Sequence, residues 1–274
     1  MNRILIVLSA NRPDISGIDF ACRLADFQGA RISGILVENM LEEAPGPKSK
    51  LALSGGGGTP ASGPVFMDTE QSVRLFEETC LHRGLEGEAE VIDRGALPHV
   101  LRESHFADLL VLSPATRVDP DDDALPSSFT RDLLRGAACP VLLAPQVFDG
   151  IDETIFCYDG SASALAALKA YTCLFPGLAK EKLTILEVGP GEEAVLDEAH
   201  RSLMKWAECH YDEVRLETLE GDPQEELFQY LFLKQRKMLV LGAFGRSLLS
   251  TLFRESTAEQ LIRTVDLPMF LSHQ

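Results

Sequence analysis

The chain has 274 residues, of which 45% are hydrophobic and 24% charged, a composition typical of soluble globular proteins long enough for two domains. Its formal net charge of −17 disfavours nucleic acid or an anionic membrane surface as a general partner, because phosphate binding depends on concentrated Lys and Arg. No apolar run approaches the ~20 residues that span a bilayer, and the N-terminus lacks the features of a signal peptide, so we expect a cytoplasmic protein. The six cysteines are dispersed without metal-ligand spacing and are expected to be mostly small buried residues.

The first half alternates between apolar runs and helical patterns. Short uninterrupted apolar runs are typical of strands buried on both faces of a parallel sheet. The predicted elements are a strand at 4–8, a helix at 18–25, a strand at 32–37, a helix at 69–82 and a strand at 88–92. Residues 45–64 are rich in Pro and Gly and predict a mobile loop, with a lid ordered by a ligand as the alternative.

The second half repeats this pattern. The segment 108–117 returns as 237–246, and each copy leads to a final strand, at 141–144 and at 269–271. Such a repeat argues for duplication. The other elements predicted in the second half are a strand at 155–158, a helix at 164–171, a strand at 183–188, a helix at 192–209 and a strand at 214–219.

The alternation of strand and helix defines the fold class. It predicts right-handed crossovers and parallel sheets with helices on both faces. We therefore expect two tandem doubly wound, Rossmann-like α/β domains with mostly parallel sheets, at 1–147 and 151–274, each with its own core. The boundary is predicted near 145–152.

A loop in the second half has the pattern of a binding site. The apolar strand at 238–241 runs into Gly242 and Gly245, and Ser256 and Thr257 open the predicted last helix. Glycines after a buried strand let the backbone approach a ligand, and the N–H groups of a helix N-terminus bind anions. Because G-x-x-G is also common in turns that bind nothing, the loop indicates either a phosphate cradle or a plain turn.

The spacing of this loop extends the pattern. Gly242-x-x-Gly245 is followed, after residues 246–254, by Glu255-Ser256. The chain here resembles the universal stress protein (UspA domain) family, whose motif is G-x-x-G, a spacer of this length and G-[S/T]; two copies of the domain would cover nearly the whole chain. The resemblance implies an adenine nucleotide alpha hydrolase-like fold that holds ATP, with Mg²⁺ if bound. Glu255 replaces the third glycine of the motif.

Two further positions match the family. Asp159 in Asp159-Gly-Ser161 resembles the aspartate of D-[G/F]-S, which contacts the nucleoside, and Val188 falls about where the family places a residue against the adenine. Gly221-Asp-Pro223 resembles the family's G-x-P turn. The nucleotide-binding residues that the resemblance implies are Asp159, Val188, Gly242, Gly245, Ser256 and Thr257.

The first half departs from this pattern. Ser9 stands in place of the aspartate, Ser113 and Thr116 stand in place of the two glycines, and the following loop carries carboxylates at 119 and 121–123. These carboxylates would repel a triphosphate, so we expect the first half not to bind ATP. The acidic loop is interpreted as a solvated surface, with a divalent cation held by it as the alternative.

Structural explanations compete with functional ones in the second half. Glu255 would weaken triphosphate binding. Alternatively, its carboxylate interacts favourably with the helix dipole, by about 0.3–1 kcal/mol, and occupies the anion site itself. Ser256 begins a capping box, and Asp159 could serve only as a helix cap. Gly242 and Gly245 could serve only the turn.

Three functional hypotheses follow. The first is a cytoplasmic tandem universal stress protein, regulatory or protective in the stress response, whose second half binds ATP or another adenine nucleotide. The second is a scaffold that binds no nucleotide and acts through an unknown protein partner. The third, an enzyme, is disfavoured because we recognise no catalytic motif, metal site or P-loop lysine, although slow hydrolysis of bound ATP stays open. The resemblance also implies that the halves pair through their final strands and that whole chains form homodimers.

Overall fold

The computed structural model describes residues 1–38, 67–178, 182–189, 198–242 and 255–272, and only the backbone of 255–258. The predicted loop at 45–64 lies outside the described residues. The elements of the first half are β1 (Arg3–Ser9), α1 (Ile15–Gln28), β2 (Arg31–Val37), α3 (Thr69–His82), β3 (Gly87–Ile92), α4 (Ala96–Ser104), β4 (Leu109–Leu112), α5 (Ser128–Gly136) and β5 (Val141–Leu143). Those of the second half are β6 (Glu153–Cys157), α6 (Ala162–Leu174), β7 (Lys182–Gly189), α7 (Glu198–Ala207), β8 (Glu213–Glu220), α8 (Pro223–Leu231), β9 (Lys237–Leu241), α9 (Glu255–Thr264) and β10 (Met269–Leu271).

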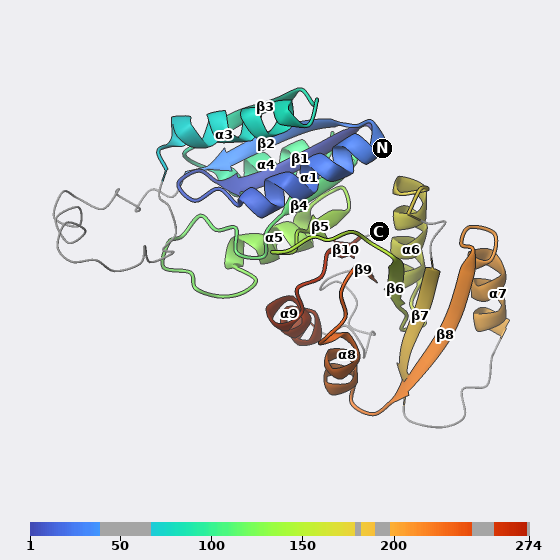
Figure 1. Cartoon of the computed structure of the whole chain (residues 1–274). Helices are drawn as coiled ribbons and strands as arrows, with labels where there is room; N and C mark the ends of the chain where they lie inside the picture. Colours follow the sequence, from blue (N-terminus) through green and yellow to red (C-terminus); the bar gives the residue numbers. More distant parts are fainter. Residues whose placement is uncertain (39–66, 179–181, 190–197, 243–254, 273–274) are drawn as a thin grey trace, which may run out of the picture.

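In the described part of the chain, ten strands form one sheet in the order β3-β2-β1-β4-β5-β10-β9-β6-β7-β8. Within each half the neighbours are parallel, whereas β5 and β10 pair antiparallel with Val141 opposite Leu271. The halves therefore lie side by side and join at the centre of the molecule (Figure 1). The predicted fold class and the pairing of the final strands are confirmed.

Two buried clusters cover the two faces of this sheet. On one face, alternate strand residues such as Ile4 and Ile6 pack with α1, α3, α6 and α7. On the other, residues such as Leu5 and Val7 pack with α4, α5, α8 and α9. Each cluster includes residues of both halves, because the β5–β10 junction makes the buried layer on each face continuous.

The strands at the outer edges of the sheet differ from the central ones. Strands β1, β4 and β9 are buried almost throughout, whereas β3 and β8 alternate between exposed and half-buried residues. Carboxylates line both edge strands, in the sequences GEAEVI and EVRLETLE. Charged side chains on an edge oppose its pairing with another strand.

The connection from β5 to β6 is fixed by side chains of the second half. Asp266 accepts hydrogen bonds from the backbone N–H of Gln146 at 2.6 Å and of Val147 at 3.3 Å. Arg236 holds the carboxylate of Asp152 with two N–H groups, at 2.6 and 2.5 Å. Across the junction, Arg131 on α5 pairs with Glu259 on α9 at 3.3 Å. The contacts of Asp266 and Glu259 with the first half hold the halves together beyond the single strand pair.

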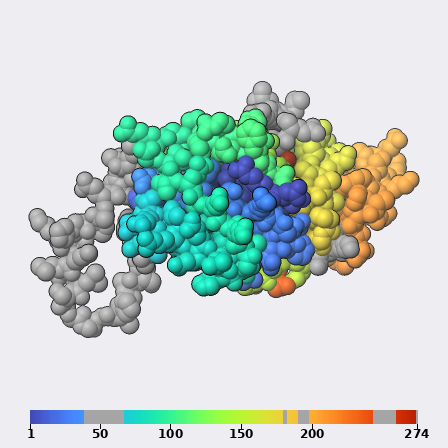
Figure 2. Space-filling view, turned by 90° about the horizontal axis from the view of Figure 1, so that it is seen from above, coloured from blue at the N-terminus to red at the C-terminus, as the bar shows by residue number. Residues whose placement is uncertain are grey.

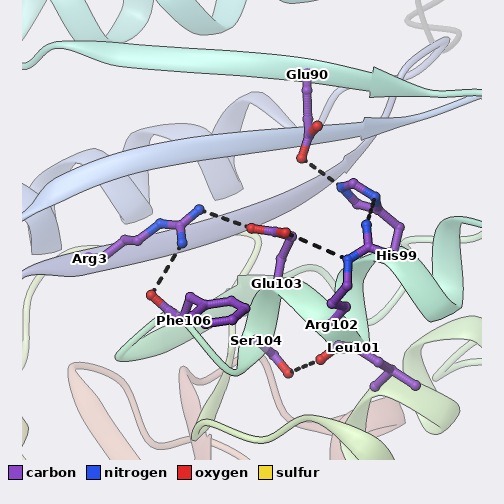
Figure 3. A network of polar contacts seen from close by, with 8 residues as sticks. All are labelled: Arg3, Glu90, His99, Leu101, Arg102, Glu103, Ser104 and Phe106. Atoms are coloured by element: carbon purple, nitrogen blue, oxygen red, sulfur yellow. Dashed lines mark hydrogen bonds and ion pairs between the residues drawn. The ribbon is translucent and has the colours of Figure 1, made fainter.

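A polar network ties α4 to the sheet of the first half (Figure 3). Arg3 on β1 pairs with Glu103 at 3.3 Å, and His99 Nε2 lies 2.7 Å from the Glu90 carboxylate on β3. Arg102 donates to His99 Nδ1 at 2.8 Å, so the ring accepts at one nitrogen and donates from the other. This histidine serves the packing of a helix against an edge strand.

A buried carboxylate joins the amino ends of three central strands in the second half. Glu153 on β6 is 7% exposed and contacts Lys182 on β7 at 3.4 Å and Lys237 on β9 at 2.8 Å. Its register partners on those strands are the same two lysines. Burial opposes ionisation, but the hydrogen bonds from Lys237 and Thr184 outweigh it and lower the pKa of Glu153.

Candidate functional site

The predicted site residues that the structure describes gather at the carboxyl edge of β6, β7 and β9. Asp159 follows Cys157, the register partner of Leu186, by two residues, and Val188 follows Leu186 by two. Gly242 stands directly after Leu241, the last residue of β9. Strand β6 lies between β7 and β9. From β6 the sheet continues through β7 and β8 toward one edge, and through β9 and β10 toward the centre of the molecule, so the strand order reverses at β6. Ligands of open α/β sheets bind at such a switch point.

Asp159 organises the turn between β6 and α6. Its Oδ1 accepts a hydrogen bond from the backbone N–H of Ser161 at 3.0 Å. The N-cap of α6 is Ser161, whose Oγ accepts from the Ala164 N–H at 3.1 Å. The interpretation of Asp159 as the helix cap is therefore wrong: the serine two residues later takes that place, and Asp159 supports the turn that presents it.

Gly242 is required by packing. A Cβ at this position would lie 2.8 Å from the backbone nitrogen of Ala164 and 2.9 Å from its Cα. The end of β9 thus touches the first turn of α6 backbone to backbone, and Gly242 is not among the glycines with positive φ. Its role is a close approach between two elements, which neither the ligand interpretation nor the turn interpretation had included.

Val188 lies on the same side of the sheet as the N-terminus of α9. It is 7% exposed and belongs to the cluster formed with α8 and α9. The first amides of α8 are capped by Asp222, which accepts from Gln224 at 2.9 Å and from Glu225 at 3.2 Å. A ligand that contacted Val188 would therefore lie on the α8 and α9 side of the edge.

The rest of the predicted motif is only partly described. Gly245 lies outside the described residues. Within the described residues α9 runs from Glu255 to Thr264, so Ser256 and Thr257 lie inside the helix. The side chains of these residues are outside the described part of the structure.

At the equivalent edge of the first half, the chain's own groups take the hydrogen bonds around the start of α5. Thr116, in place of a glycine, is buried, and its carbonyl accepts hydrogen bonds from Ser127 Oγ and, at 3.0 Å, from Thr130 Oγ1. The carboxylate of Asp122 accepts from the backbone N–H of Ser128, the first residue of α5, at 2.6 Å. This hydrogen bond lowers the pKa of Asp122. A carboxylate of the chain thus occupies the position at which this helix N-terminus would bind an anion.

The acidic loop before α5 is held by an arginine. Arg117 pairs with Asp123 at 3.1 Å and donates to the carbonyl of Asp122 at 3.0 Å. Within the described ranges, no group of three or more His, Cys, Asp or Glu residues is arranged to hold a metal ion. The loop is therefore organised by an internal ion pair. No sequence pattern had pointed to Asp122 as the residue that reaches the helix.

Helices of the described ranges include none long and apolar enough to cross a membrane. The fold and the edge of β6, β7 and β9 together define a class: a tandem of two doubly wound α/β halves with a topological switch point at β6 in the second half. Residues 154–273 match the model of the "Universal stress protein family". The second half of the chain therefore matches the universal stress protein family, and the first half has the same strand order.

Solved structures share this fold over the whole length. A universal stress protein from Archaeoglobus fulgidus DSM 4304 aligns with 99% of this chain and 98% of its own at 15% identity, with a TM-score of 0.71. A putative universal stress protein from Pseudomonas aeruginosa UCBPP-PA14 aligns with 100% of this chain and 93% of its own at 15% identity, with a TM-score of 0.59. The cytoplasmic domain of a prokaryotic cation chloride cotransporter aligns with 98% of this chain and 94% of its own at 14% identity, with a TM-score of 0.52. At these identities the likeness shows the fold alone.

A shorter structure aligns with one half only. The universal stress protein from Archaeoglobus fulgidus in complex with dAMP covers 52% of this chain at 13% identity, with a TM-score of 0.34. At that score the likeness says nothing of ligand binding by this chain. The comparison with curated protein sequences returned no significant match.

Proposed function

We propose that this protein is a stress-response regulatory or protective protein whose second half binds ATP or another adenine nucleotide at the carboxyl edge of β6, β7 and β9. The observation that carries the proposal is the convergence of Asp159, Val188 and Gly242 from three strands at the switch point. The match of residues 154–273 to the family supports it.

The described residues fit the nucleoside part of such a ligand. Asp159 lies half-buried at the edge, and a carboxylate there can accept hydrogen bonds from ribose hydroxyls. Val188 provides apolar surface for a base. The N-terminal end of α9, the helix that contains Ser256 and Thr257, would receive the phosphates, since free N–H groups and the helix dipole favour anions. Mg²⁺ would accompany a bound triphosphate and neutralise part of its charge.

The first half is proposed not to bind nucleotide. Its helix N-terminus already holds the Asp122 carboxylate, which a phosphate would have to displace. We further propose that the protein acts by binding and not by catalysis. His99 and His200, for example, lie 2.7 and 2.9 Å from structural carboxylates, at Glu90 and Glu187.

The test begins with mass analysis of small molecules released by denaturing the purified protein. Calorimetric titration of the ligand-free protein with ATP and Mg²⁺ follows, on the wild type and on Asp159→Ala and Gly245→Val. The matched control is Ser9→Ala, which alters the corresponding position of the first half. The proposal expects binding that both second-half variants weaken at least tenfold and that the control leaves unchanged. Absence of bound nucleotide and of any heat of binding would refute it.

A variant at Glu255 tests the charge argument separately. Replacing the motif glycine by glutamate adds a negative charge near the expected phosphates, so Glu255→Gly should tighten ATP binding while leaving AMP binding less affected. Equal affinity of the variant and the wild type for ATP would show that Glu255 does not repel the triphosphate.

A second candidate function is binding of a protein partner at the first half. A cavity of about 640 Å³ opens between the N-terminal ends of α4 and α5, at the first-half counterpart of the proposed nucleotide edge. Its lining includes the apolar Val118 and Phe129, and its charged residues are mostly acidic: Asp93, Asp119, Asp121 and Asp132 beside Arg94. Apolar side chains with carboxylates suit a basic segment that carries an apolar side chain, and the net charge of −17 favours such a partner.

This alternative has its own measurement. Fluorescence anisotropy with a labelled Arg- and Leu-containing peptide should show salt-dependent binding that Asp132→Lys weakens, while a Glu- and Leu-containing peptide should not bind. Homodimer formation by whole chains remains a prediction, to be measured by analytical ultracentrifugation. The carboxylates on β3 and β8 argue that such a dimer would not form through the sheet edges.

A further inference from the structure

Two cysteine sulfurs are in contact inside the first half. The Sγ atoms of Cys22 on α1 and Cys80 on α3 lie 3.6 Å apart, and both residues are 0% exposed. Of the six cysteines, all within the described ranges, Cys139 and Cys157 are buried elsewhere, and Cys173 and Cys209 are exposed. This is the pair for which the structure records a sulfur–sulfur contact.

The packing of α3 directs Cys80 toward this contact. Helix α3 buries Ser72, Phe76 and Cys80, which recur every four residues and form one stripe. On the sheet beneath, Gly87 leaves the room that Cys80 fills, since a Cβ there would lie 2.5 Å from Cys80 Sγ. Neither a larger residue at 87 nor a rotation of α3 would be compatible with this arrangement.

We propose that Cys22 and Cys80 are a reversible redox pair that closes a disulfide when the protein meets hydrogen peroxide. A disulfide has an S–S bond of about 2.05 Å, so the sulfurs must approach by roughly 1.5 Å from their 3.6 Å contact. Disulfides in intracellular proteins are rare and are usually transient, catalytic or redox-sensing, so a pair already in contact is a candidate for such a role.

The reaction balances with one peroxide. The Cys80 sulfur attacks a peroxide oxygen, and an S–O bond forms as the O–O bond breaks. The products are a sulfenic acid on Cys80 and one molecule of water. The Cys22 sulfur then attacks the Cys80 sulfur, the S–S bond forms as the S–O bond breaks, and a second water leaves. The two thiol protons end in the two waters, the sulfurs lose two electrons and the peroxide gains them.

The contact favours this division of roles. The hydrogen bond between the two thiols lowers the pKa of Cys80, while the same hydrogen bond and burial raise the pKa of Cys22. The thiolate is the nucleophile toward peroxide, so Cys80 is the better first reactant and Cys22 the resolving thiol.

Oxidant reaches the pair when α3 opens. This helix covers β2 and the half-exposed edge strand β3, and its cyan residues lie at the surface in the view of Figure 2. An element that buries one narrow stripe over an edge strand belongs to the low-stability end of a structure. Local opening of α3 would expose Cys80 while α1, with seven buried residues, stays packed. Closure of the bond would then tie α3 to α1.

The bond should raise thermal stability. It would close a loop between residues 58 positions apart and so constrain the unfolded chain. For a protein of this size we expect the midpoint of thermal unfolding to rise by roughly 5–10 °C. The inference concerns the first half alone and stands whether or not the second half binds nucleotide.

The experiment uses the full chain with Cys173→Ser and Cys209→Ser, which removes the exposed thiols and cross-links between molecules. After treatment with hydrogen peroxide, peptide mapping should find Cys22 joined to Cys80, and dithiothreitol should reverse both the bond and the rise in midpoint. Cys80→Ala in the same background should lose the bond and the rise. Cys22→Ala should leave a sulfenic acid on Cys80 that a 1,3-diketone reagent traps.

A second experiment tests whether peroxide reaches Cys22 and Cys80 through the opening of α3. The same oxidation is repeated in urea below the main unfolding transition, where α3 opens more often. If Cys22 and Cys80 remain reduced there while Cys139 or Cys157 is oxidised, or if Cys80 proceeds to sulfinic acid without bonding to Cys22, the proposal is overturned. If the bond forms faster in urea than in buffer, the route through α3 is supported.

Discussion

Replacement of Gly242 by alanine tests whether this motif glycine serves the fold before it serves any ligand. The added Cβ would stand 2.8 and 2.9 Å from two backbone atoms of Ala164, whereas ordinary contacts lie at 3.4–4 Å. Backbone atoms in the first turn of a helix cannot rotate away, so either the end of β9 or α6 must shift by about half an ångström. Overpacking of this kind costs about 1–3 kcal/mol.

The unfolded chain offsets part of that cost. Alanine restricts the unfolded state more than glycine does, which stabilises the fold by about 0.4–1 kcal/mol where the native conformation accepts it. We therefore expect Gly242→Ala to lower the free energy of unfolding by about 1–2 kcal/mol. Urea denaturation followed by circular dichroism at 25 °C, without nucleotide, measures this as a shift in midpoint with an unchanged slope.

Gly189 provides the matched control. It ends β7 at the same edge of the sheet, and a Cβ built on it meets no atom of the described residues within 4 Å. Gly189→Ala should therefore be as stable as the wild type or slightly more stable. If Gly242→Ala and Gly189→Ala shift the midpoint equally, the steric argument is wrong, and Gly242 would have to be explained by ligand or by chain flexibility.

Two further substitutions test the charge networks. Glu153→Gln leaves Lys182 and Lys237 without their buried carboxylate and should lower the free energy of unfolding by about 2 kcal/mol. This is less than the loss for a fully buried pair, because the lysine side chains are 26% and 20% exposed. Urea denaturation at pH 7 measures the change, and a value under about 0.5 kcal/mol would contradict the reasoning. Asp122→Ala removes the carboxylate from the Ser128 N–H and should cost about 0.5–1 kcal/mol after screening by solvent, measured by thermal unfolding. Because the folded pKa of Asp122 lies below its ordinary value of 3.8, its stabilisation is complete above that pH and disappears as the pH falls through the folded pKa. The difference between Asp122→Ala and the wild type should therefore shrink toward zero in acid, and a difference constant with pH would count against the helix-capping role.

The sequence pattern predicts the regular elements well where apolar periodicity is strong. The strands predicted at 4–8 and 183–188 correspond to β1 and β7 with one residue added at each end. Helix α4 is not among the predicted elements; its Pro98 stands in the first turn, where a proline removes only an N–H that has no helical partner. Local pattern thus finds elements and their order.

Contacts between distant segments account for what the pattern missed. Nothing near Asp122 indicates that its carboxylate folds back onto a helix six residues later, and the backbone contact between Gly242 and Ala164 joins segments far apart in the chain. Ser161, by contrast, could have been identified as a cap, because a serine directly before an apolar helical stretch is a known start signal. The continuous core follows from the β5–β10 pairing, which repeated sequence suggests but does not prove.

That antiparallel junction has a consequence for how the two halves can evolve. In a symmetric pair of identical subunits every substitution appears on both sides of the interface at once, so neither side can specialise alone. Here two unlike halves of one chain face each other through β5 and β10. Asp122 could therefore be placed at one helix N-terminus while the opposite half kept its glycines, and each edge of the sheet became free to acquire a task of its own.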